Sequence, residues 1–116
     1  MSDIKRINTG KRMSDATIFN GVVYLAGQVA DDDALDIEGQ TKQVLATIDR
    51  LLAEAGTDKT RILRAQIFLA NIIEFSGMNK AWDAWVPAGH APARATTEAR
   101  LASPDYKVEI MVTAAL

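Results

Sequence analysis

Arg94 is the residue whose type and setting most clearly suggest chemistry. It lies two positions after Pro92, and beyond that proline the alternation of residues puts Arg94, Thr96 and Glu98 on one side of an expected strand. A guanidinium fixed on a strand presents a planar fork of donors that matches a carboxylate, which a flexible lysine does less well. An arginine in this setting is suited to recognition of a small carboxylic acid. The alternative is that Arg94 reaches solvent or pairs with a structural carboxylate such as Glu98, and this stretch alone does not choose between the two.

Glu109 is the second candidate, because it is a carboxylate inside an apolar run at the end of the chain. The alternation in residues 106–116 predicts a strand with one wholly apolar face, formed by Val108, Ile110, Val112 and Ala114. Glu109 falls on the other face. A carboxylate in such a run costs free energy unless it is paired, hydrogen-bonded or at the edge of a site. The alternative is an edge strand with that face in water.

Gly27 comes at the end of a predicted hairpin. Residues 16–29 form two β-rich runs around Asn20-Gly21, a pair that tolerates the positive φ angles of a type I′ turn. Gly27 interrupts the second run, which indicates a bend or a backbone that another group approaches closely. Taken by itself, the stretch favours a simple bend over a ligand contact at Gly27 and Gln28.

Metal and thiol chemistry have little support in the residue types. The chain has no cysteine, so a disulfide, a thiol nucleophile and a zinc-thiolate site are excluded. Asp31, Asp32 and Asp33 lack the spaced oxygen ligands and the distal glutamate of a calcium-binding loop, which favours a solvated loop. We therefore predict no metal site.

Length and composition indicate one domain over residues 1–116. Hydrophobic residues make up 48% and charged residues 24%, as in soluble globular proteins, and no apolar run is long enough to span a bilayer. The first residues lack the features of a signal or transit peptide, so a cytoplasmic location is expected. The formal net charge of -2 and the short basic spots argue against nucleic acid as a partner.

Two helices are predicted from apolar residues that recur at three- and four-residue steps. The first covers residues 36–55, with Asp36 as the expected N-cap and Gly56 just past its end. The second covers residues 74–86 and ends before Pro87. Its tryptophans are expected to be core anchors rather than a stacking site for a ligand.

A strand is predicted over residues 61–70, and one face of it is wholly apolar: Leu63, Ala65, Ile67 and Leu69. The expected order is strand, strand, helix, strand, helix, strand, strand, which is an α+β arrangement with a mixed sheet. Two helices cannot cover both faces of such a sheet, so we expect them to share one face and leave the other open. The four apolar residues of this strand are expected on the open face, buried between copies of the chain in an oligomer.

Short motifs occur in order along nearly the whole chain. They are Gly21-Val-Val-Tyr-Leu-Ala-Gly27-Gln28, Gln40-Thr-Lys-Gln43-Val-Leu, Ala-Gly56, Met-Asn79-Lys-Ala-Trp, Pro92-Ala-Arg94 and Val108-Glu109-Ile. Together, at this spacing, they resemble the Rid/YjgF family of enamine/imine deaminases. The resemblance implies a chorismate-mutase-like α+β fold, a homotrimer, and three sites in clefts between neighbouring subunits.

The resemblance also implies a reaction and a set of site residues. The reaction is hydrolysis of reactive 2-imino acids or their enamine tautomers, such as 2-aminoacrylate-type intermediates, to 2-oxo acids and ammonia, a form of metabolite damage control. Arg94 would hold the substrate carboxylate, and Glu109 would orient and help deprotonate the attacking water. The substrate-binding residues would be Gly27, through its backbone, Ala26, Ala95, Thr96 and Met13. No metal or organic cofactor is implied.

Three of these positions depart from the family pattern. Met13 stands where well-studied members carry a tyrosine, Ala26 stands where they carry a serine, and Thr96 replaces a frequent cysteine. The lost hydroxyl groups suggest a bulkier or more apolar imino acid than the smallest ones the family handles.

An alternative function keeps the fold without catalysis. Arg94 would then capture a carboxylate ligand in a regulatory or chaperone-like trimer that has no turnover. A ribonuclease is disfavoured, since His90 is the only histidine, lies in a loop bracketed by proline and glycine, and belongs to a chain with an acidic charge balance.

Overall fold

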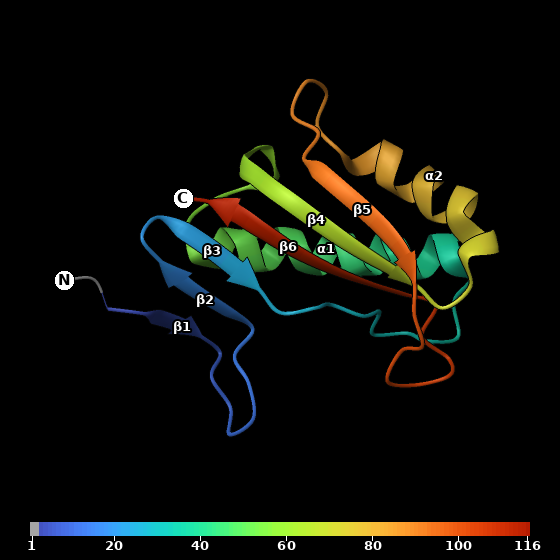
Figure 1. The fold of residues 1–116 in the computed structure, drawn as a ribbon, viewed down its shortest axis with the longest axis horizontal. Coiled ribbons are helices and arrows are strands. Elements are labelled where there is room, and N and C mark those ends of the chain that lie inside the picture. Colours follow the sequence, from blue (N-terminus) through green and yellow to red (C-terminus); the bar gives the residue numbers. More distant parts are fainter. Residues whose placement is uncertain (1–2) are drawn as a thin grey trace.

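Residues 3–116, which the structure describes, form a six-stranded sheet with two helices packed against one of its faces (Figure 1). The structure is a computed structural model. The strands are β1 Lys5–Ile7, β2 Ala16–Phe19, β3 Val22–Leu25, β4 Ile62–Leu69, β5 Ala93–Glu98 and β6 Val108–Ala115. The helices are α1 Ile37–Ala55 and α2 Phe75–Trp85, with short 3-10 turns at Lys59–Arg61 and Ile72–Glu74.

The sheet is mixed, and its strand order is β1-β2-β3-β6-β4-β5. All neighbouring strands are antiparallel except β4 and β5, which are parallel and are connected through α2. The last strand, β6, therefore lies in the middle of the sheet between β3 and β4. This confirms the predicted mixed α+β arrangement with both helices on one face.

Local sequence signals set the ends of several elements. Asn20 and Gly21 have φ angles of 49° and 76°, which confirms the predicted tight turn between β2 and β3. The side chain of Asp36 accepts a hydrogen bond of 2.8 Å from the backbone of Gly39, and Gly56 ends α1 with a φ of 91°. The first strand, β1, was not predicted, because three residues are too few to show an alternating pattern.

The core lies between the helices and the sheet face they cover. The apolar stripe of α1 and the alternate residues of β6 are fully buried there, as predicted. Trp82 is 5% exposed and anchors α2, which confirms its expected core role.

The prediction for the two faces of β4 was wrong. Ala65, Ile67 and Leu69 are fully buried under the helices, whereas Leu63 is 51% exposed on the opposite face. A register irregularity between Ile62 and Arg64 breaks the alternation at this point. Burial of the apolar side chains of Ala65, Ile67 and Leu69 under the helices is more favourable than burial of the mixed face, so the mixed face is left open.

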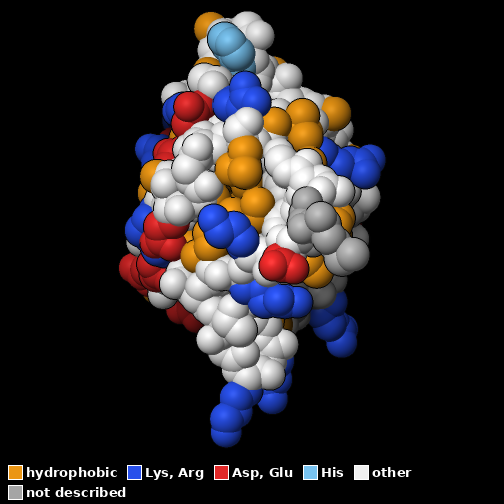
Figure 2. Space-filling view, turned by 90° about the vertical axis from the view of Figure 1, so that its left-hand side faces the viewer, with side chains coloured by type: hydrophobic (Ala, Val, Ile, Leu, Met, Phe, Trp, Pro, Cys, Tyr) orange, Lys and Arg blue, Asp and Glu red, His pale blue; other side chains and the backbone are white. Residues whose placement is uncertain are grey.

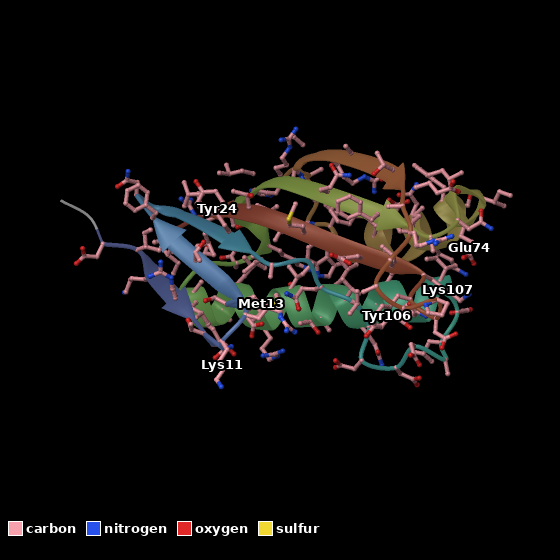
Figure 3. The ribbon with its side chains drawn as sticks, turned by 60° about the horizontal axis from the view of Figure 1, so that its bottom comes forward. Lys11, Met13, Tyr24, Glu74, Tyr106 and Lys107 are labelled. Atoms are coloured by element: carbon pink, nitrogen blue, oxygen red, sulfur yellow. The ribbon has the colours of Figure 1, made fainter. Side chains whose placement is uncertain are left out.

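The open face of the sheet carries several exposed apolar side chains. Tyr24, Leu63 and Met111 are 48%, 51% and 43% exposed, and they come from β3, β4 and β6. Figure 3 shows Tyr24 on the side of the sheet away from α1. Exposed apolar surface spread over three strands is typical of a face that packs against another molecule.

Figure 2 shows Lys and Arg side chains projecting from the end of the molecule where the loop between β1 and β2 lies. Figure 3 places Lys11 in that loop, beyond Met13. Within the described residues, none of the helices combines the length and the apolar character that crossing a bilayer would require.

Candidate functional site

The guanidinium of Arg94 is half-buried between β5 and α2. Its Nη1 donates a hydrogen bond of 2.8 Å to Oδ1 of Asn79. The central guanidinium carbon lies 5.1 Å from the ring centre of Trp82 and 5.7 Å from that of Phe75. Both distances are within the range of cation–π attraction. The side chain is therefore held by one hydrogen bond and two aromatic rings.

One stripe of α2 provides all three of these contacts. Phe75, Asn79 and Trp82 follow at steps of four and three residues, which puts them on one face of the helix. The parallel pairing of β5 with β4 then brings Arg94 under that stripe, in register with Ala65. The sequence pattern predicts a core role for Trp82 and indicates no role for Asn79. The helical spacing of these residues relative to one another was the signal that could have found them.

The environment of Arg94 lacks a neutralising carboxylate. Burial lowers the pKa of its guanidinium, and the negative charge of Asp83 partly opposes that shift. Within residues 3–116, the ion pairs join only Lys42, Arg50 and Lys80 to acidic residues, so Arg94 forms none. Glu98, the suggested structural partner, instead accepts a hydrogen bond of 3.0 Å from the backbone of Ile72.

Thr96 lies on the same face of β5 as Arg94, and Ala95 lies on the other. Thr96 pairs with Ile67 under the helices, and its hydroxyl is buried without a hydrogen-bond partner among the described residues. Ala95 is exposed and pairs with Gln66 of β4. The two predicted site residues that follow Arg94 thus face in opposite directions.

Glu109 and Gly27 form a second cluster on the open face. A Cβ atom on Gly27 would overlap the Glu109 carboxylate, coming within 3.0 Å of the carboxyl carbon and still closer to Oε2. The backbones of Gln28 and Ile110 exchange two hydrogen bonds of 2.9 and 3.0 Å, which fixes this approach. The side chain of Gln28 also donates to the backbone oxygen of Ala26 at 2.9 Å. The close approach explains why position 27 holds a residue without a side chain.

Ala26 directly precedes Gly27, and Met13 lies in the loop between β1 and β2. The backbone of Ala26 donates a hydrogen bond of 2.9 Å to Asp15, which ties it to the end of the loop that carries Met13. That loop is itself ordered by a hydrogen bond of 2.8 Å from Gly10 to Met13. The side chain of Met13 is 57% exposed, and Figure 3 shows it at the base of the loop between β1 and β2.

Arg94 and Glu109 lie on opposite faces of the sheet in one chain. Arg94 is in register with Ala65, which is buried under the helices. Glu109 is in register with Phe68, three residues further along β4 and on the open face. Each chain therefore carries two separate clusters: the arginine cluster around Arg94 and the glutamate cluster around Glu109. A single copy does not bring them together.

One hollow lies beside the loop between β5 and β6, and neither cluster lines it. That hollow has a volume of about 740 Å³ and is formed by the loop between β5 and β6, together with Ala70. A smaller hollow of about 230 Å³ is lined by Phe68, Leu101 and Glu109. No three His, Asp or Glu side chains within residues 3–116 are grouped in a way that could hold a metal ion.

Comparison with known proteins identifies relatives over the whole chain. The sequence model described as Endoribonuclease L-PSP matches residues 3–116. A RutC family protein from Haemophilus ducreyi is 51% identical over 113 residues, which are 97% of each chain. The RutC family protein YoaB from Escherichia coli is 50% identical, over 97% of this chain and 98% of its own.

Solved structures agree with the sequence relatives. A member of the YjgF protein family from Neisseria meningitidis superposes with a TM-score of 0.95 at 47% identity, over 97% of this chain and 94% of its own. An uncharacterized protein from Pseudomonas aeruginosa gives a TM-score of 0.94 at 42% identity, over 97% and 98%. The chain therefore belongs to the Rid/YjgF family, the family of the Endoribonuclease L-PSP sequence model.

Proposed function

We propose that this protein is a hydrolytic deaminase of 2-imino acids and their enamine tautomers, with a 2-oxo acid and ammonia as products. One observation carries the proposal: Arg94 is a half-buried cation, held on an aromatic surface, with no carboxylate partner among the described residues. A desolvated guanidinium of this kind is suited to a ligand carboxylate. Membership of the Rid/YjgF family is compatible with this chemistry.

The proposed site forms between copies of the chain. Because the arginine and glutamate clusters face opposite sides of one sheet, Arg94 of one copy would meet Glu109 of another. The exposed apolar residues of the open face support such packing, since they would leave water when copies associate. We propose a chorismate-mutase-like homotrimer, because three copies related by rotation give three equivalent sites and a closed assembly.

The reaction would proceed by addition of water to a carbon–nitrogen double bond. Arg94 holds the substrate carboxylate, which fixes the position of the neighbouring imine carbon. The oxygen of a water molecule bonds to that carbon while Glu109 accepts a proton from the water, and the imine nitrogen is protonated. Collapse of the tetrahedral adduct breaks the carbon–nitrogen bond, releases ammonia and leaves a 2-oxo acid. The steps are additions and proton transfers, so they call for no oxidant or reductant.

The residues beside the two clusters bear on the choice of substrate. Met13 and Ala26 are apolar residues at two positions where the family resemblance implies hydroxyl groups, and the side chain of Met13 is 57% exposed. We therefore propose an imino acid with a side chain larger or more apolar than a methyl group.

The description of the matching sequence model also names an endoribonuclease. His90, the single histidine, is exposed in the loop between α2 and β5, with its Nδ1 3.0 Å from the backbone oxygen of Ala88. It belongs to neither cluster, so general acid–base cleavage of RNA by a histidine has no support in this geometry.

The test is ammonia release from an imine generated in the assay by an amino acid oxidase. The wild-type protein should accelerate release, and Arg94→Ala should lower kcat/KM by roughly two decades or more, because a charge-assisted pair in a partly desolvated site is lost. Circular dichroism and light scattering should show an unchanged fold and assembly. If Arg94→Ala retains wild-type release, the arginine has no role in turnover and the deaminase assignment fails. Carboxylate binding without any turnover would favour the regulatory alternative.

A further inference from the structure

We propose that Asn79 is a positioning residue whose neutral amide holds Arg94 in place and leaves its fork of donors available for the substrate carboxylate. The proposal rests on the proposed function and deepens it, because it explains how one chain keeps an arginine ready for a small acid. Its starting point is the hydrogen bond of 2.8 Å from Arg94 Nη1 to Asn79 Oδ1.

Some of the contacts of Arg94 hold its guanidinium in place, and they leave most of its N–H donors without a partner. A guanidinium carries five N–H donors in one plane, and Asn79 takes one of them. Trp82 and Phe75 lie at 5.1 and 5.7 Å from its central carbon, so aromatic surface packs around the group. The remaining donors have no side-chain acceptor among the described residues. A ligand carboxylate can therefore bind without first displacing a protein group.

The charge of the side chain at position 79 decides whether the donors of Arg94 stay available for a ligand. The amide oxygen of Asn79 accepts one hydrogen bond from Arg94 and brings no negative charge, so the charge of the guanidinium is not neutralised. A carboxylate at the same position would pair with Arg94 by two hydrogen bonds and compete with the substrate. The nearest acidic influence on Arg94 is Asp83, one helical turn further along α2, and it forms no ion pair with the guanidinium.

This arrangement predicts that stability and affinity respond in opposite directions to one substitution. Asn79→Asp would place a carboxylate within reach of a half-buried cation, which favours the folded state. The same new ion pair would occupy the donors that the substrate needs. A residue with a purely structural role would change stability and ligand affinity in the same direction.

The experiment compares Asn79→Asp with Asn71→Asp in the full chain. Asn71→Asp introduces the same negative charge at a residue that does not contact Arg94. The Asn71 side chain caps the 3-10 turn before α2 by accepting a hydrogen bond of 3.0 Å from the backbone of Ile73, and aspartate caps a helix equally well. The probe is pyruvate, a small 2-oxo acid, with its Kd measured by calorimetry. Imine hydrolysis and Tm are measured for the same variants.

Asn79→Asp is expected to raise the Kd for pyruvate and the KM for imine by about tenfold or more, with Tm equal to or above that of the wild type. Asn71→Asp should leave Kd and KM unchanged. Asn79→Ala should lower kcat/KM less than Arg94→Ala does, because the fork is loosened but not occupied.

Two results would overturn the positioning role. One is a wild-type Kd and KM in Asn79→Asp, and the other is a joint fall of Tm and affinity in that variant. Arg94→Ala separates this proposal from the proposed function. If Arg94→Ala abolishes pyruvate binding while Asn79→Asp binds normally, only the role of Asn79 is wrong. If Arg94→Ala itself binds and turns over normally, the proposed function fails.

Discussion

The two proposed functional groups, the cation of Arg94 and the carboxylate of Glu109, lie apart within one chain. Arg94 is held by Asn79 and two aromatic rings, and Glu109 lies over Gly27 on the other side of the sheet. The two groups have different tasks in the proposed reaction, because one binds a charge and the other moves a proton. Substitutions at the two positions should therefore have distinguishable kinetic effects.

Glu109→Gln should lower kcat while leaving carboxylate binding nearly unchanged. Glutamine keeps the shape of the side chain but cannot accept a proton from water, so the chemical step slows. Arg94→Lys should instead weaken carboxylate binding, since an ammonium does not reproduce the planar fork. Steady-state kinetics together with calorimetry of pyruvate binding measure both effects. Equal losses of kcat and affinity in Glu109→Gln would assign Glu109 to binding rather than to proton transfer.

Gly27→Ala should disable the glutamate cluster. Its Cβ would overlap the Glu109 carboxylate, so the side chain must move from its present position. A displacement of about 1 Å costs roughly 100-fold in kcat/KM when it concerns a catalytic group. Gly10→Ala is the matched control, since its Cβ would make an ordinary contact of 3.6 Å with the backbone oxygen of Met13. Comparable activity in the two alanine variants would show that Glu109 has no catalytic position to lose.

Among the elements, α2 and β5 act as one unit. The chain leaves β4, forms α2 and returns as β5 parallel to β4, which brings one stripe of the helix over the face of β5 that carries Arg94. α1 contacts this unit through α2, because Nε1 of Trp85 in α2 donates a hydrogen bond of 2.9 Å to the carboxylate of Asp49 in α1. The arginine cluster therefore depends on helix packing, and changes in α1 should act on stability before they act on chemistry.

Asp36→Ala should destabilise the protein without touching either cluster. The Asp36 side chain accepts a hydrogen bond of 2.8 Å from Gly39 at the start of α1, and loss of such a cap costs about 1 kcal/mol. The free energy of unfolding, measured with urea, should fall by that amount. Asp31→Ala is the control, because Asp31 is exposed in the preceding loop and caps no helix. An equal loss in both variants would point to a general charge effect rather than capping.

At the scale of the whole molecule, the two faces of the sheet have opposite requirements. One face is closed by the helices within each chain, while the other carries Tyr24, Leu63 and Met111 in exposed positions. The proposed trimer would cover the second face and join the two clusters in one step. Activity should therefore depend on assembly even though every catalytic group is present in each copy.

Met111→Lys should separate the copies while preserving the fold. Met111 is 43% exposed on the open face, so a lysine there is solvated in the free chain but buried at an interface. Sedimentation should show a smaller species, and imine hydrolysis should fall with it. Ile67→Lys is the contrasting variant: Ile67 is fully buried under the helices, and a charge there should prevent folding altogether. A fully active Met111→Lys monomer would refute a site shared between copies.

Sequence patterns predicted the helices, the hairpin and the apolar face of β6, because periodicity and turn chemistry are local properties of the chain. Arg94, Glu109 and Gly27 were also candidates from the sequence, since each residue type is unusual in its immediate setting. The short strand β1 and the face of β4 that packs on the helices were not recovered. A three-residue strand carries no period. Alternation along β4 shows which residues share a face but not which face the helices cover, and the irregularity between Ile62 and Arg64 moves Leu63 off the face of Ala65, Ile67 and Leu69.

Residue types and their order along the chain determined by themselves the longer helices and strands, the family that the motifs resemble and the side chains that are candidates for chemistry. Tertiary structure alone decided how those candidates are grouped. The stripe of α2 meets Arg94 because β5 pairs in parallel with β4, and Glu109 faces away because it lies in register with Phe68 rather than with Ala65. Register and helix packing depend on contacts between residues far apart in the chain, and local patterns do not encode them.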